Sequence, residues 1–152
     1  IGTAETIHAA NRGERITAIF INNAIYGMTG GQMAPTTLIS QRTTTTPYGR
    51  DATLEGYPLK ISEMLALLDG VVYIERTAAN SPAGIRKTKK AIRKAFQVQV
   101  DGLGFSLVEI LSPCPVNWKM GIPESWRWID EEMTKVFPPG LIKDTTGAQD
   151  AD

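Results

Sequence analysis

Three short apolar runs alternate with amphipathic helical patterns, and this alternation constrains the fold of the chain more than any other feature. The runs cover residues 17–21, 71–75 and 105–111. Each is almost continuously apolar and is bounded by polar or turn residues, as a buried strand of a parallel sheet is. Helical patterns lie before, between and after them, at residues 3–12, 58–68, 82–100 and 125–136. This order predicts an α/β fold with a three-layer αβα architecture, in which helices cover both faces of a mostly parallel sheet.

The helix that starts at Pro82 has the clearest pattern in the chain. We expect it to place an apolar stripe against the sheet and to end before the Asp-Gly pair at residues 101–102. The stripe would consist of Ile85, Ile92 and Phe96, with Ala91 and Ala95 beside it.

A long segment without a helix or strand pattern separates the first apolar run from the next helix. It covers residues 34–57 and includes Pro35, Pro47 and a run of four threonines at residues 43–46. Loops of this length are usually functional or disordered. Beyond residue 140 the sequence is polar, so we expect one domain over residues 1–144 and a flexible tail at residues 145–152.

Composition and charge exclude several classes of function. The 152 residues carry a formal net charge of +0, and 42% of them are hydrophobic, so neither nucleic-acid nor membrane binding is expected. The longest apolar runs are far too short to span a bilayer. The single cysteine, Cys114, excludes an internal disulfide and indicates the reducing cytoplasm. Because the chain opens with Ile1 inside a helical pattern, we expect the natural protein to continue upstream.

Residues 22–32, directly after the first apolar run, combine oxygen ligands with glycines. Asn23 offers a neutral side-chain oxygen suited to Mg²⁺, and the carbonyl of Ile25 could reach the same ion if the chain bends. Three glycines would let backbone N–H groups approach a phosphate closely. They are Gly27, Gly30 and Gly31. The pattern predicts a magnesium-diphosphate site at the carboxyl end of a strand, and the alternative is a tight turn whose glycines serve only backbone geometry.

The same segment resembles the second half of the thiamine-diphosphate motif of 2-oxoacid:ferredoxin oxidoreductase β subunits. Further matching stretches are Ala-Pro-Thr-Thr at 34–37, Thr-Thr-Thr-Pro-Tyr-Gly at 44–49, Asp-Gly at 69–70, Ser-Pro-Cys-Pro-Val-Asn-Trp at 112–118 and Phe-Pro at 137–138. The resemblance covers nearly all of residues 1–144. It implies a thiamine-diphosphate-binding fold, of which this chain would be the C-terminal part in an N-terminally truncated subunit.

The resemblance also implies a role for each matched residue of the glycine-rich segment. The side-chain oxygen of Asn23 and the backbone carbonyl of Ile25 would bind Mg²⁺, and Gly27, Met28 and Thr29 would lie against thiamine diphosphate. The remaining protein ligand of the family, the aspartate of a Gly-Asp-Gly motif, would lie upstream of this chain. Because that aspartate is the only charged ligand, we expect the chain alone to bind metal weakly.

The reaction implied by the resemblance is the oxidative decarboxylation of a 2-oxoacid with coenzyme A, with electrons passed through iron–sulfur clusters to ferredoxin. The implied partner is an α subunit that carries the pyrimidine-binding domain. We assign no catalytic residue in this chain and expect it to be inactive alone. The substrate could be 2-oxoglutarate or a branched-chain 2-oxoacid such as 2-oxoisovalerate.

Cys114 lies between two prolines after the third apolar run. A lone buried thiol is the simplest interpretation. The resemblance makes it instead the last of four cysteine ligands of a four-iron four-sulfur cluster in the full-length protein. One cysteine cannot hold such a cluster, so we expect the chain alone to be cluster-free.

Other interpretations remain open from the sequence alone. The chain could belong to another thiamine-diphosphate lyase or synthase, or it could be a non-catalytic phosphate-binding module. The helix after Pro82 carries six Lys and Arg residues between positions 86 and 94, which favour a solvated face, with docking of acidic ferredoxin or of coenzyme A phosphates as the alternative. The threonine run could line the entrance for substrate or form an ordered loop without direct contacts.

Overall fold

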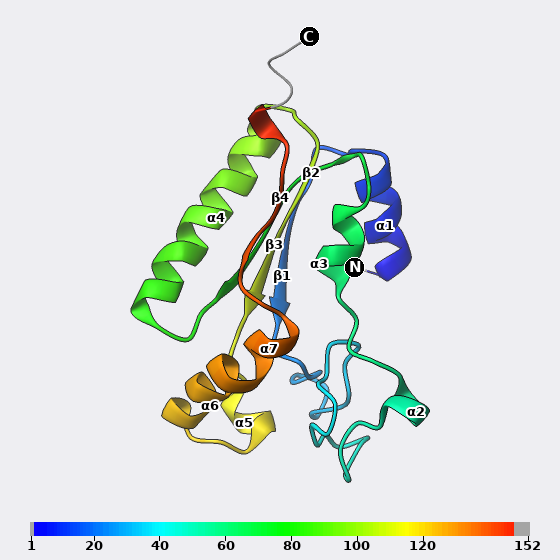
Figure 1. The fold of residues 1–152 in the computed structure, drawn as a ribbon, viewed down its shortest axis with the longest axis vertical. Coiled ribbons are helices and arrows are strands. Elements are labelled where there is room, and N and C mark those ends of the chain that lie inside the picture. Colours follow the sequence, from blue (N-terminus) through cyan, green and yellow to red (C-terminus); the bar gives the residue numbers. More distant parts are fainter. Residues whose placement is uncertain (1, 148–152) are drawn as a thin grey trace.

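A four-stranded sheet runs through the centre of the chain in the computed structural model, which describes residues 2–147 (Figure 1). Three strands are parallel, and the fourth pairs antiparallel with its neighbour at one edge. In sequence order they are β1 (Thr17–Asn22), β2 (Val71–Ala78), β3 (Phe105–Leu111) and β4 (Gly140–Asp144). In space the order is β1-β3-β2-β4, so β3 occupies the centre of the parallel part.

Helices cover both faces of the sheet, which confirms the predicted three-layer αβα architecture (Figure 1). The longest helix packs on one face, and two shorter helices pack on the other. The remaining helices gather beyond the carboxyl ends of the strands. In sequence order, all the helices of the described residues are α1 (Thr3–Asn11), α2 (Ala52–Glu55), α3 (Ile61–Ala66), α4 (Pro82–Val100), α5 (Pro115–Trp118), α6 (Ile122–Trp128), the π-helix η1 (Ile129–Met133) and α7 (Thr134–Val136).

The long helix α4 begins and ends where the sequence predicts, but its buried face differs from the expected stripe. Ser81 caps it by accepting a hydrogen bond from the N–H of Gly84. Ala91, Ala95 and Val98 are buried against the sheet, with Ile92 partly buried beside them. The predicted stripe residues Ile85 and Phe96 are 45% and 47% exposed. Small side chains face the sheet, which lets the helix approach it closely.

The first strand is correctly placed in the sequence, but the expectation that it is buried is wrong. Among the described residues β1 pairs with β3 alone and forms an edge of the sheet. Ile19 is 38% exposed and Ile21 is 53% exposed, and only Asn22 of this strand is buried. An apolar run indicates that a strand could be buried on both faces. Whether the strand is buried depends on its position in the sheet, and β1 lies at an edge.

The C-terminal part of the chain is more ordered than predicted. Residues 140–144, for which the sequence predicts no strand, form β4 on the edge of β2. The N–H of Thr145 donates to the carbonyl of Val72 at 2.9 Å, which continues this docking into the predicted tail. Residues 148–152 of that tail lie outside the described residues. Smaller differences occur at α3, which begins at residue 61 rather than 58, and at α6, which begins before residue 125.

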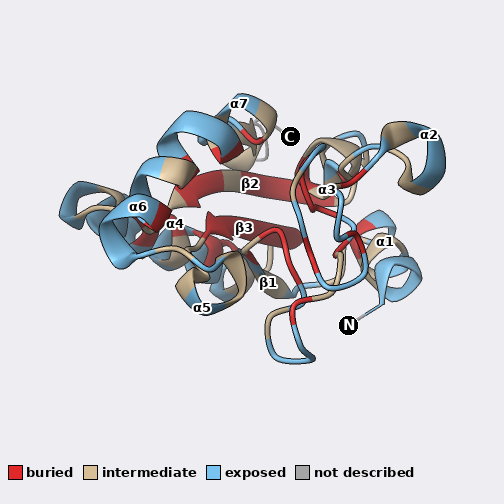
Figure 2. Ribbon diagram, turned by 90° about the horizontal axis from the view of Figure 1, so that it is seen from below, coloured by how far each residue is buried: buried red, intermediate tan, exposed pale blue. Residues whose placement is uncertain are grey.

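Seen from the end where the parallel strands finish, β2 and β3 lie buried at the centre of the molecule (Figure 2). The outer surfaces of α6, α7 and α2 are exposed around them. The segment after β1 and the segment after β3 both emerge at this end, which is where open parallel sheets bind their ligands.

Candidate functional site

Two loops meet at the carboxyl ends of β1 and β3. The strands are parallel neighbours whose last residues, Asn22 and Leu111, are in register, so the segments that follow them start side by side. The N–H of Ser112 donates to the carbonyl of Asn22 at 3.0 Å. The indole N–H of Trp118 donates to the carbonyl of Asn23 at 3.1 Å. Residues 22–32 and residues 112–118 therefore meet at this end of the sheet.

The chain bends sharply at the start of the glycine-rich segment. Asn22 and Asn23 form two consecutive side-chain turns: each Oδ1 accepts the backbone N–H two residues on, at 3.1 Å from Ala24 and 3.3 Å from Ile25. Ala24 has a φ of 54°, a left-handed conformation that is uncommon for a residue with a side chain. It is fully buried, and its carbonyl accepts the hydroxyl of Thr37 at 2.7 Å. Contacts on both sides thus hold this residue in a strained backbone conformation.

Two of the predicted cofactor-binding residues, Asn23 and Ile25, line a cavity of about 380 Å³. The cavity extends along β1 and is closed on another side by residues 34–36. Within the part of the chain that the structure describes, no hydrogen bond reaches the carbonyl oxygen of Ile25. Asn23 and Ile25 therefore lie two residues apart in one tight turn, and both line this cavity.

The other three predicted cofactor-binding residues do not line that cavity: Gly27 is partly buried, and Met28 and Thr29 are exposed. Tyr26 and Gln32 close the segment through a short antiparallel bridge. Among the described residues, the backbone N–H groups of residues 27–29 form no hydrogen bond, which leaves three successive donors for a ligand. The hydroxyl of Thr29 donates to Oε1 of Gln32, so its own predicted contact would require that bond to be exchanged.

Cys114 lies directly beside the glycine-rich segment. A Cβ atom at Gly27 would lie 3.1 Å from Sγ of Cys114 and 3.0 Å from Nδ2 of Asn117. The amide of Asn117 donates to that sulfur at 3.3 Å. A side chain at position 27 would therefore require the neighbouring side chains to shift by a few tenths of an ångström. Within residues 2–147, no group of three or more His, Cys, Asp or Glu side chains gathers that could hold a metal ion.

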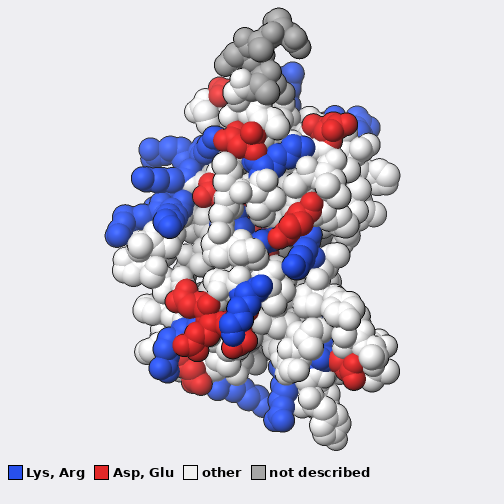
Figure 3. Space-filling model, in the orientation of Figure 1, with Lys and Arg blue, Asp and Glu red and all other residues white. Residues whose placement is uncertain are grey.

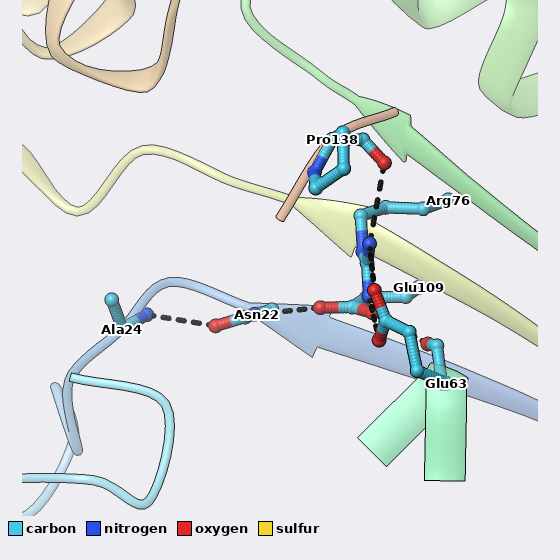
Figure 4. A network of polar contacts seen from close by, with 7 residues as sticks. Asn22, Ala24, Glu63, Arg76, Glu109 and Pro138 are labelled. Carbon is cyan, nitrogen blue, oxygen red and sulfur yellow. Dashed lines mark hydrogen bonds and ion pairs between the residues drawn. The ribbon is translucent and has the colours of Figure 1, made fainter. Parts of the chain in front are cut away.

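A buried polar network lies beneath the site, and sequence analysis did not find it (Figure 4). Glu109 in β3 is fully buried, and its carboxylate accepts hydrogen bonds from Nε of Arg76 at 2.8 Å, from Nδ2 of Asn22 at 2.7 Å and from the hydroxyl of Ser62 at 2.5 Å. Arg76 in β2 is also buried and bonds both carboxylate oxygens of Glu63, at 2.9 and 2.7 Å. The network joins three strands and a helix through two ion pairs, both formed by Arg76.

The charges of this network support one another. Burial alone would lower the pKa of Arg76, but the hydrogen bonds that it donates to Glu63 and the charge of Glu109 outweigh burial and raise that pKa. Partial burial would raise the pKa of Glu63, but hydrogen bonding to Arg76 prevails and lowers it. Both groups are thereby held in their charged forms. The guanidinium also donates to the carbonyl of Pro138 at 3.2 Å and lies 5.5 Å from the ring centre of Phe137.

A signal for this network was present in the sequence. Glu109 is the one charged residue of the apolar run 105–111, and Arg76 directly follows the run 71–75. Charged side chains are almost never fully buried unless they are paired. In the structure the two residues lie directly opposite each other in the register of β2 and β3. Opposite charges within consecutive apolar strands should therefore be considered as a possible buried pair.

A second buried arginine organises the long segment 34–57. The guanidinium of Arg50 donates to five backbone carbonyls at distances from 2.6 to 3.0 Å. The acceptors are Pro35, Thr37, Glu55, Gly56 and Tyr57. Burial lowers the pKa of Arg50, and the charge of Glu55 offsets part of that effect. The segment is therefore an ordered loop built around one cation, and no sequence pattern predicted this role for Arg50.

The basic residues of α4 form a surface away from the glycine-rich segment (Figure 3). Five of the six have exposed side chains without an ion pair among the described residues, and the sixth, Lys94, pairs with Asp144 in β4. This arrangement agrees with the interpretation as a solvated face. None of the helices within residues 2–147 combines the length and apolar character needed to cross a bilayer.

The family described as "Thiamine pyrophosphate enzyme, C-terminal TPP binding domain" matches residues 1–110 of the sequence. The chain belongs to this family. Its relatives include the ketoisovalerate oxidoreductase subunit VorA of Methanothermobacter marburgensis, 49% identical over 144 residues that make up 95% of this chain. The 2-oxoglutarate synthase subunit KorB of Archaeoglobus fulgidus is 41% identical over 120 residues, or 79% of this chain. The resemblance stated from the sequence motifs is thus confirmed.

The chain spans only 30% and 40% of the lengths of these two relatives. A solved structure of 2-oxoglutarate:ferredoxin oxidoreductase from Magnetococcus marinus, with 2-oxoglutarate, coenzyme A and succinyl-CoA bound, has the same fold. The TM-score is 0.69 at 23% sequence identity, and the match covers 95% of this chain and 52% of that chain. The fold of the thiamine-diphosphate-binding domain is therefore established for this chain.

Proposed function

We propose that this chain is the part of a 2-oxoacid:ferredoxin oxidoreductase β subunit that holds the diphosphate end of thiamine diphosphate through Mg²⁺. The observation that supports it most is the double turn at residues 22–25, which presents the amide of Asn23 and the unbonded carbonyl of Ile25 at the carboxyl end of β1. Membership of the family identifies thiamine diphosphate as the cofactor, and the turn provides two oxygen atoms of the kind that Mg²⁺ prefers as ligands.

The residues present fit such a group. Asn23 and Ile25 would bind the ion, and Gly27, Met28 and Thr29 would direct their unbonded N–H groups toward the diphosphate oxygens. When bound, thiamine diphosphate would supply a nucleophilic carbon and a cationic ring that serves as the electron sink for decarboxylation of a 2-oxoacid. The contribution of this chain is to bind and orient that cofactor, and Glu109, Arg76 and Arg50 are too deeply buried to contact substrate.

The wider assignment follows from the relatives. Their names refer to ketoisovalerate and 2-oxoglutarate, so we infer a 2-oxoacid substrate with coenzyme A as the acyl acceptor, in the cytoplasm. An α subunit would supply the pyrimidine-binding domain, and ferredoxin would accept the electrons. Cys114 would join three cysteines from the rest of the protein around a four-iron four-sulfur cluster. Its contact with Gly27 would place that cluster next to the cofactor, as electron transfer between them requires.

Calorimetry of the intact subunit with thiamine diphosphate, with and without Mg²⁺, tests this proposal. We expect Mg²⁺-dependent binding that Asn23→Ala abolishes, because the mutation removes one of the few oxygen ligands. Asn11→Ala, at an exposed position at the end of α1, is the matched control and should bind normally. Wild-type affinity in Asn23→Ala would refute the ligand assignment. Binding of inorganic diphosphate without binding of thiamine diphosphate would favour a non-catalytic phosphate-binding module.

A further inference from the structure

The side chain of Asn22 connects the buried ion pair to the turn that carries the proposed Mg²⁺ ligands (Figure 4). It is 1% exposed. Its Nδ2 donates to Oε1 of Glu109 at 2.7 Å, and its Oδ1 accepts the N–H of Ala24 at 3.1 Å. Both ends of one amide are thus engaged, on opposite sides, within the protein interior.

The orientation of this amide is fixed by the chemistry of its partners. An ionised carboxylate can only accept hydrogen bonds, so Glu109 requires the NH₂ end of Asn22 to face it. The oxygen end must then face the N–H of Ala24, which can only donate. A reversed amide would set an oxygen against the carboxylate and an NH₂ group against an N–H. Both contacts would be lost at a buried position, where unpaired polar groups are costly.

Glu109 itself has little freedom to move. Arg76 and Ser62 both donate to its Oε2, which leaves Oε1 directed at Asn22. Neither residue touches the glycine-rich segment through these bonds. The path from the ion pair to the site therefore runs through one side chain, from Glu109 to Asn22 and on to the N–H of Ala24.

We propose that Glu109 is a positioning residue for the cofactor-binding turn. By dictating which way the Asn22 amide points, it holds Ala24 in its left-handed conformation and so sets the direction of the next two residues, Asn23 and Ile25. This inference rests on the proposed function, because the role of the turn is to present oxygen ligands to Mg²⁺.

Glu109→Gln is the decisive variant because it keeps the shape of the side chain. The oxygen of the amide introduced at position 109 would have to face Arg76 and Ser62, which both donate, so its NH₂ group would face Asn22 and force that side chain to reverse. Mutation of a residue that orients a metal ligand typically lowers metal affinity by about 10 to 100-fold. We expect this variant to weaken Mg²⁺–thiamine diphosphate binding of the intact subunit by about that factor. In the absence of cofactor, amide hydrogen exchange of the peptide containing residues 22–26 should be faster in this variant than in wild type.

The double variant that combines Asn22→Asp with Glu109→Gln should restore both properties. The carboxylate introduced at position 22 can accept from the new amide at position 109 and from the N–H of Ala24. The pair keeps one negative charge near Arg76, so the hydrogen-bond chain is complete in the opposite sense. A residue that only stabilises the fold would not be rescued by exchanging amide and carboxylate. Ser62→Ala is the matched control, since it removes a bond to the same carboxylate without affecting Asn22, and we expect unchanged affinity.

The outcomes separate the two proposals. If wild-type subunit binds no thiamine diphosphate, the proposed function fails, while hydrogen exchange still tests the positioning role. If wild type binds and Glu109→Gln shows equal affinity and equal exchange, or if the double variant is no better than the single, the positioning role is overturned. Should Glu109→Gln not fold, Asn22→Leu replaces it: the Arg76 pair is retained and the amide is removed. Wild-type affinity in Asn22→Leu would then contradict the inference.

Discussion

Two buried arginines hold the candidate site from opposite sides, and they do so in different ways. Arg76 lies within the sheet and is neutralised by the carboxylates of Glu109 and Glu63. Arg50 lies within the loop and is surrounded by five carbonyl oxygens with no direct ion pair among the described residues. Accordingly, the pKa of Arg76 is raised and that of Arg50 is lowered by burial.

The two systems meet at Ala24. Its N–H is held by Asn22, which leads to Glu109 and Arg76. Its carbonyl is held by Thr37, whose own carbonyl accepts from Arg50 at 2.6 Å. The difference teaches that a few paired side chains are enough to fix a strand, because its backbone hydrogen bonds are already made. A loop without such bonds needs a cation that collects its free carbonyls.

The largest effect is expected from Arg76→Met. It leaves the fully buried Glu109 without its counter-charge, and breaking a buried pair from one side typically costs about 3 to 5 kcal/mol. Urea denaturation should show this loss in the free energy of unfolding. Arg93→Met, at an exposed position of α4, serves as the control and should change it little. A loss as small as that of the control would mean that the pair contributes nothing to folding.

Arg50→Met should lower the free energy of unfolding of the whole chain less than Arg76→Met does. The freed carbonyls belong to a surface loop that water can reach after a small rearrangement, so we expect about 1 to 3 kcal/mol. The larger consequence should be local: limited proteolysis should cut residues 34–57 faster than in wild type. Arg42→Met changes a more accessible arginine of the same segment and should leave cleavage unaltered. If Arg50→Met destabilised the chain more than Arg76→Met, the contrast between the two sites would be reversed.

Thr37→Val should lower the free energy of unfolding modestly, because Thr37 connects the Arg50 network to Ala24. It removes the hydroxyl that donates to Ala24 and accepts the N–H of Ala34 at 2.8 Å. Loss of such bonds at buried groups costs about 1 to 2 kcal/mol, measurable by urea denaturation. The control is Thr44→Val, an exposed threonine whose side chain forms no hydrogen bond among the described residues. Equal unfolding free energies of the two variants would show that the Ala24 carbonyl needs no partner.

The smallest expected effect is a pH dependence of the free energy of unfolding, which arises from Glu63 at the Arg76 site. The pKa of Glu63 is lowered in the folded chain by Arg76 despite partial burial, so its ionised form contributes stability above its ordinary pKa of 4.5. That contribution should be lost as pH falls through the lowered folded-state value. The stability difference between wild type and Glu63→Gln should therefore be largest near neutral pH and shrink below pH 4.5. Glu131→Gln, on the exposed side of η1, should show no such trend.

Local patterns were sufficient for most of the elements. The span of β3 and the start and end of α4 follow directly from apolar periodicity and caps, because these signals depend on neighbouring residues. The exposure of β1 and the existence of β4 did not follow, because each depends on which strands become neighbours. The same holds for the buried face of α4, where the sheet selects small residues over Ile85 and Phe96.

The sequence by itself determined the layered α/β architecture and the segment that carries Asn23, Ile25 and the glycines, because strand periodicity and residue chemistry are written in consecutive positions. Tertiary structure alone decided what holds that segment in place. Glu109 meets Asn22 across 87 positions of the chain, and Arg50 gathers carbonyls from both ends of a long loop. Such contacts depend on which strands become neighbours, so a charged residue in an apolar run signals a buried pair without naming its partner.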